Sequence, residues 1–241
     1  MNITKEKLIE ECEIFINKIR FANACTSILD TLSHNKNSPV WKREYEIAPV
    51  FFTITQMSLK RTILMETAKI FEVRKENIRI PKLCKQCKNL KLFRKRKSSI
   101  SIQKLIEHCK YSKLFEKSSL SQYTQLLDSL NPTIKNLLRH RDKFLAHNDK
   151  KYFTNPNLLT KDFPISIYGK DRRTIEQSKN NSLAIDYENG IIDLLGYAFS
   201  ICENILNALT GENEKRQISY TNVHDINELF MVLNKYDVKD T

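Results

Sequence analysis

The chain has 241 residues, of which 41% are apolar and 28% are charged, and its formal net charge is +12. These values exclude a disordered chain and allow a sizeable hydrophobic core. With only 4 glycines and 6 prolines against many leucines, lysines and glutamates, the composition predicts an all-α fold, and we expect a single domain over residues 1–241. The charged N-terminus does not predict a secretory signal, and no apolar stretch approaches the ~20 residues that span a bilayer. We therefore expect a soluble, cytoplasmic protein without a membrane partner.

Two long helices are predicted in the first third of the chain by apolar residues spaced alternately by four and three. The first should end near residues 34–39, and Arg61 interrupts the apolar face of the second. The face of the first helix comprises Leu8, Cys12, Phe15, Ile19, Ala22, Thr26 and Leu29. The face of the second comprises Val50, Ile54, Met57, Arg61, Leu64, Ala68 and Phe71.

Residues 74–97 have no periodicity and are predicted to form a basic loop insertion. They contain eleven lysines and arginines against the single acid Glu76. Such a block would neutralise phosphates, so RNA is the expected partner, with Arg94, Lys95, Arg96 and Lys97 as candidate contacts. The alternative is a solvated loop without a specific partner.

A zinc site is a second possibility in this part of the chain, because Cys84 and Cys87 have half of the usual ligand spacing. The nearby candidates to complete it, His108 and Cys109, are adjacent on a predicted helix and would point about 100° apart. We therefore expect no metal, and reduced thiols that partly serve as small core side chains. The sequence has no paired carboxylates for two metals and no phosphate-binding glycine loop, so we also expect no cofactor.

The second half of the chain is predicted to contain further helices. Two short ones should cover about 100–110 and 118–130, and Asn131 should cap a third with Pro132 at its first position. Residues 152–181 should be mostly loop, with a short strand or hairpin at Phe163–Tyr168. A last long helix should run from Ser182 to a stop at Gly211, followed by a minor helix around Asp225–Leu233. Several such helices describe a bundle.

The helix that follows Asn131 carries Arg141 on an apolar face with Ile134, Leu137, Leu138, Phe144 and Leu145. A buried guanidinium needs an anionic partner, because it stays charged. His147 lies six residues further on and could take a proton from an RNA 2′-hydroxyl while Arg141 holds the phosphate. Alternatively, Arg141 pairs with Asp142 or another acid and His147 caps the helix.

The segment Arg141-Asp-Lys-Phe-Leu-Ala-His147 resembles the signature of HEPN domains, in which an arginine and a histidine are separated by four to six residues, the first of them polar. Its continuation through Asn148 and Asp149 is similar to abortive-infection HEPN proteins of the AbiU-like branch. Residues 40–150 share further features with that branch, namely Trp41, Phe51-Phe52 and the apolar helix Leu64–Glu72.

The resemblance implies a HEPN-like bundle that dimerises and cleaves RNA without a metal ion. His147 would be the general acid or base, Arg141 the phosphate ligand and Asp142 an orienting residue. Asn148 lies one heptad after Arg141, so it is a candidate to assist phosphate binding, and a helix C-terminal cap explains it equally well. An ideal helix places Arg141 and His147 about 120° apart, so a distorted helix, side-chain reach or the partner subunit must bring them together. Asp149 stands where relatives controlled by a nucleotidyltransferase antitoxin carry tyrosine, which makes that regulation doubtful.

We thus expect an endoribonuclease of the abortive-infection or toxin type, acting as a homodimer, with an antitoxin or other regulatory protein as a further possible partner. The first alternative is a catalytically silent HEPN module that binds RNA or a protein. The second is a zinc-stabilised DNA-binding protein.

Overall fold

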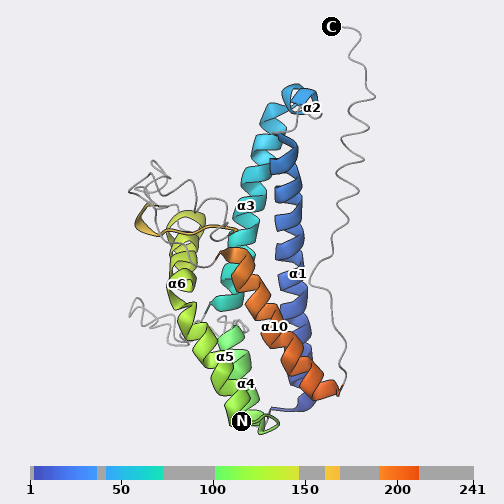
Figure 1. Ribbon diagram of the computed structural model, residues 1–241, viewed down its shortest axis with the longest axis vertical. Helices are drawn as coiled ribbons and strands as arrows, with labels where there is room; N and C mark the ends of the chain where they lie inside the picture. The colour runs from blue at the N-terminus through green and yellow to red at the C-terminus, as the bar shows by residue number, and fades with distance from the viewer. Residues whose placement is uncertain (1–2, 37–41, 73–100, 147–160, 169–189, 212–241) are drawn as a thin grey trace, which may run out of the picture.

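The computed structural model describes residues 3–36, 42–72, 101–146, 161–168 and 190–211 (Figure 1). These residues form seven α-helices and one π-helix, and no strand occurs among them. The expected all-α fold is therefore confirmed. The α-helices are α1 (Lys5–Lys36), α2 (Lys42–Ile47), α3 (Pro49–Phe71), α4 (Ile102–Ser112), α5 (Lys117–Ser129), α6 (Asn131–His140) and α10 (Ile191–Thr210), and the π-helix is η3 (Arg141–Ala146).

The helix α1 is the central support of the bundle and packs against α3, α4 and α10. All seven residues of its predicted apolar face are buried, and its end at Lys36 lies in the predicted range. Regular spacing thus identified both the helix and its packed face. The buried face also includes one carboxylate, Glu11, which is 2% exposed.

The second predicted helix, α3, exists, but its apolar face is covered only in part. Ala68 and Phe71 are buried, whereas Val50 is 68% exposed and Ile54 is 57% exposed. The predicted apolar face is therefore packed against the bundle only in the second half of the helix. Figure 1 shows the reason, since the upper end of the α1–α3 pair has only α2 beside it among the labelled helices and stands clear of α4, α5, α6 and α10.

The last predicted helix is shorter than expected. It begins at Ile191, because Gly190 is extended and donates its N–H to Asp193 Oδ2 over 2.7 Å. It ends as predicted at Gly211, which has a φ of +76°. By length and composition this 20-residue helix could cross a membrane, and half of its apolar window is buried inside the bundle.

The remaining predictions meet mixed outcomes. The helices expected at about 100–110 and 118–130 are α4 and α5. Asn131 is already helical with Leu130 as the cap residue, so the predicted cap is off by one position. Residues 163–168 form bends and coil instead of a strand, because their carbonyls serve other elements. The basic loop at 74–97 and the helix at 225–233 lie outside the described residues.

The segment 161–168 runs from the neighbourhood of α6 to the start of α10 (Figure 1, gold). The carbonyls of Ser166 and Ile167 accept hydrogen bonds from the N–H groups of Ile191 and Ile192 over 2.9 and 3.0 Å. They satisfy donors that the first turn of a helix leaves without intrahelical partners. We call residues 161–168 the strap.

Candidate functional site

The candidate site begins where α6 becomes the π-helix η3. Arg141 is the first residue of η3, and Asp142 follows it. A π-helix bonds each residue to the fifth one along the chain, which widens the backbone and often marks functional sites. We call α6 together with η3 the motif helix. It is distorted where the Arg141 motif begins, and a distorted helix is one of the three ways in which the side chains of Arg141 and His147 were expected to come together.

The guanidinium of Arg141 lies between two carboxylates. Its Nε and Nη2 atoms donate to Asp142 Oδ1 over 2.8 and 2.6 Å. Its Nη1 atom lies 2.9 Å from Glu72 Oε2 in an ion pair that lacks hydrogen-bond alignment. Glu72 directly follows α3, so this contact ties the end of α3 to the start of η3. The anionic partner predicted for Arg141 is confirmed, and there are two of them.

The three charged side chains differ in their access to solvent. Arg141 is 15% exposed and Glu72 18%, whereas Asp142 is 48% exposed. Leu137, one turn before Arg141, is fully buried. The guanidinium therefore lies at the edge of the core, and of its two acidic partners Asp142 is the more exposed.

Glu72 was missed as a site residue by sequence reasoning. It belongs to the segment Leu64–Glu72 that resembles the family, but nothing in that pattern pairs it with Arg141. Two facts together point to Glu72. A largely buried arginine requires an acidic partner, and Glu72 follows α3, which packs on α6. Only the fold brings the two residues together.

His140 is a second residue that sequence reasoning missed. It is 7% exposed, and its Nε2 atom lies 2.5 Å from the carbonyl oxygen of Phe163 in the strap. Burial lowers the pKa of His140, and the contact with the Phe163 carbonyl opposes this only in part. The neutral imidazole therefore donates to the strap from the residue next to Arg141.

Two neighbours of His140 on α6 also hold the strap. Asn136 donates to the carbonyl of Pro164 over 2.9 Å, and the guanidinium of Arg139 lies 4.9 Å from the centre of the Phe163 ring. Together the three contacts fix the motif helix against the strap, and through it against α10. Arg141 and the residues before it are therefore held from two sides, by Glu72, which follows α3, and by the strap.

The other predicted site residues lie outside the described residues. These are His147, Asn148, Arg94, Lys95, Arg96 and Lys97. Of the predicted catalytic group the structure thus places Arg141 and Asp142, and it brings them into direct contact. The predicted roles stay predictions.

The candidate zinc ligands in the described part of the chain have other surroundings. His108 Nδ1 lies 2.8 Å from Glu11 Oε2, and the buried Cys109 thiol has its pKa raised to about 12 by burial and by Glu11. Within the described residues no three His, Cys, Asp or Glu side chains gather where they could hold a metal ion. Cys84 and Cys87 lie outside those residues.

An all-α bundle with an arginine-led motif at a helix distortion has the architecture expected of a HEPN domain. A family model described as AbiU2, within the HEPN domains, matches residues 2–228. The chain therefore belongs to the AbiU2 family of abortive-infection HEPN domain proteins. No curated protein and no solved structure matches it.

Proposed function

We propose that the protein is a cytoplasmic endoribonuclease that needs no metal ion, acts as a homodimer and cleaves RNA through Arg141, Asp142 and His147. Membership of the abortive-infection family supports the class of activity. The observation that carries the proposal is the position of Arg141. Its guanidinium contacts Glu72, which is 18% exposed, and Asp142, which is 48% exposed, and these are the acids paired with it among the described residues. A substrate phosphate can therefore approach from the solvent side.

The proposed reaction is a transfer within the RNA chain. His147 takes the proton of the 2′-hydroxyl, the 2′-oxygen attacks the adjacent phosphorus, and the bond from phosphorus to the 5′-oxygen breaks. The leaving oxygen takes up a proton from a second acid. The products are a 2′,3′-cyclic phosphate and a 5′-hydroxyl end. Arg141 offsets the charge that develops on the phosphate, which is worth most at a partly desolvated site.

Two carboxylates have further parts in this proposal. Glu72 acts as a positioning residue, because it contacts Arg141 and is less exposed than Asp142. Asp142 orients the guanidinium in the absence of RNA and must move away from it, or share it, when a phosphate binds. The basic residues Arg94, Lys95, Arg96 and Lys97 would add contacts to neighbouring phosphates.

The second candidate function is a catalytically silent module that binds RNA or a regulatory protein such as an antitoxin. The observation that favours it is the same ion-paired state of Arg141, since two carboxylates already neutralise the guanidinium. Complete burial of Arg141 and its two acidic partners would strengthen this alternative, because RNA could not reach the guanidinium. The 48% exposure of Asp142 weakens it.

The first experiment distinguishes the two functions. Purified protein is incubated with single-stranded RNA in excess EDTA, and the product ends are identified by their reaction with a kinase and a cyclic phosphodiesterase. We expect cleavage with 2′,3′-cyclic phosphate ends, and a loss of about 10²-fold or more in His147→Ala, the range of general acid–base catalysis. His34→Ala is the matched control, because His34 is exposed on α1.

Cleavage of DNA at a similar rate, or its loss in EDTA, would contradict this mechanism. Specific RNA binding without cleavage would establish the silent module instead. Both outcomes are read in the same assay when binding is followed in parallel.

The second experiment tests whether the active centre combines residues from two subunits. The variants Arg141→Ala and His147→Ala, each inactive alone, are mixed under conditions of subunit exchange. Because a mixed dimer can assemble one composite site with both groups intact, part of the activity should return. No activity returns if both residues act within one chain. A monomer by light scattering at micromolar concentration would exclude the homodimer.

A further inference from the structure

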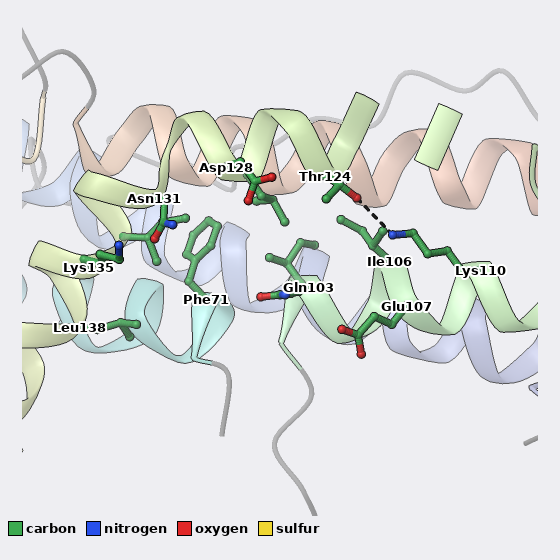
Figure 2. A pocket seen from close by; sticks show the side chains of 13 residues that line it. Phe71, Gln103, Ile106, Glu107, Lys110, Thr124, Asp128, Asn131, Lys135 and Leu138 are labelled. Atoms are coloured by element: carbon green, nitrogen blue, oxygen red, sulfur yellow. Dashed lines mark hydrogen bonds between the residues drawn. The ribbon is translucent and has the colours of Figure 1, made fainter. Parts of the chain in front are cut away.

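A groove lies between α4 on one side and α5 and α6 on the other, and its cavity volume is about 310 Å³. This is near the lower limit of small-ligand pockets, so it suits one flat ring system rather than a folded chain segment. Lys110 and Thr124 close one end, where Lys110 Nζ donates to Thr124 Oγ1 over 3.4 Å (Figure 2). Lys135 and Leu138 lie at the other end (Figure 2).

The groove has an apolar floor and a polar rim. Phe71 is central in the floor, with Gln103 on one side and Asn131 on the other (Figure 2). Asp128 and Lys135 are also exposed on the rim. The floor also includes Ile102, Ile106, Leu127 and Ile134.

The charges of the rim cancel. Glu107 and Asp128 balance Lys110 and Lys135, so the groove offers no net attraction to a phosphate group. It does offer amide donors and acceptors from Gln103 and Asn131 and a carboxylate acceptor from Asp128. A ligand with apolar faces and a hydrogen-bonding edge matches this arrangement.

The groove reaches the proposed active site through two connections. Phe71 is followed directly by Glu72, whose carboxylate contacts Arg141. Leu138 lies three residues before Arg141 on the same helix, a rise of roughly 4.5 Å. The lining of the groove is therefore adjacent along the chain to both partners of the Glu72–Arg141 ion pair.

We propose that this groove binds one unpaired nucleobase of the RNA, next to the phosphate held by Arg141. This inference rests on the proposed function for its substrate class. Proteins recognise single-stranded RNA by placing bases against aromatic or apolar side chains and by hydrogen-bonding their edges, which are the two features of this groove. The groove thus selects single-stranded RNA, because a base within a helix cannot enter it.

The test uses single-stranded hexamers of each of the four bases with 2′-O-methyl riboses, which cannot be cleaved by attack of the 2′-oxygen. Their affinities for the full chain are measured by fluorescence anisotropy. Gln103→Trp places a bulky ring in the groove, and Gln103→Phe is a second, uncharged filling variant in case the first is poorly folded. Gln125→Trp is the matched control, because Gln125 is exposed on α5 outside the groove.

We expect the affinity for the preferred hexamer to fall about tenfold in both filling variants, with a smaller difference between the four bases, as for the loss of one base-stacking contact. Gln125→Trp should bind like the wild type. Unchanged affinities for all four hexamers in a folded filling variant would overturn the proposal.

The two proposals fail in different ways. If the Gln103 variants bind the hexamers more weakly but the wild type leaves unmodified RNA intact, the proposed base-binding groove stands and the proposed nuclease activity is contradicted. If the wild type cleaves RNA but both filling variants bind the hexamers with unchanged affinity, the proposed nuclease activity stands and the proposed base-binding groove is contradicted.

Discussion

The two halves of α3 have similar apolar content but different surroundings. In the first half, Val50, Ile54 and Met57 are between 50% and 68% exposed. In the second half, Ile63 and Ile70 have no exposed surface. The first half has α1 and α2 beside it, whereas the second approaches α4, α6, η3 and α10 (Figure 1). The proposed active site lies at the covered end, where Glu72 follows the helix.

This difference shows that helical spacing predicts a helix and not the extent of its burial. An arginine provides the clearest example, because Arg61 and Arg141 both interrupt apolar faces. Arg61 is exposed on α3, while Arg141 is held between two carboxylates. The same sequence pattern, an arginine on an apolar helical face, thus occurs at an exposed position and at an ion-paired one. Substitutions of the two arginines can distinguish their roles.

The largest expected effect compares these two arginines. Arg141→Ala should lower RNA cleavage by about 10²-fold or more, because it removes the charge that stabilises the developing phosphate anion. Arg61→Ala should change the rate less than about twofold, as expected for a surface position distant from the site. Arg141→Lys should recover little activity, because an ammonium lacks the planar fork of donors. Initial rates on one RNA substrate measure all three, and equal losses in Arg61→Ala and Arg141→Ala would contradict the comparison.

The next effect concerns stability along α3. Ile63→Ala should lower the free energy of unfolding by about 2–5 kcal/mol, because it leaves a cavity in the core. Ile54→Ala makes the same chemical change at a residue that is 57% exposed, and it should cost less than about 0.5 kcal/mol. Urea unfolding followed by circular dichroism gives both values. A large cost at Ile54 would mean that something covers this face in solution.

The smallest effect is a pH dependence of the contact between the motif helix and the strap. Burial lowers the pKa of His140 in the folded protein, so the unfolded chain binds a proton more readily. The stability from neutral His140 is therefore fully present above the ordinary pKa and is lost as the pH falls through about 6.5 toward the lower folded pKa. The slope cannot exceed about 1.4 kcal/mol per pH unit for one group.

His140→Gln tests this pH dependence, because it keeps a donor and removes the titration. Unfolding midpoints of the wild type and the variant are compared between pH 7.5 and 5.5. The stability of the variant should decline less steeply with acidification. Parallel curves would show that His140 does not contribute.

Much of the fold followed from local sequence patterns, and much of the site did not. The packed face of α1, the extents of α4 and α5, and the stop at Gly211 were predictable, because each depends on neighbouring residues along the chain. The pairing of Arg141 with Glu72 was not, since the partners are far apart in sequence and meet only through packing of α3 on α6. The start of α10 also escaped prediction, because the extended Gly190 and the carboxylate of Asp193 define it.

The strap has a consequence for cooperativity. Its carbonyls accept from the first turn of α10 and, at Phe163 and Pro164, from the motif helix, so neither helix can fray there without releasing the other. Local opening at the motif would then expose the start of the most apolar helix and should have a free energy close to that of global unfolding. Slow hydrogen exchange of the Ile191 and Ile192 amides on α10 would thus show that the proposed active site at the start of η3 is intact.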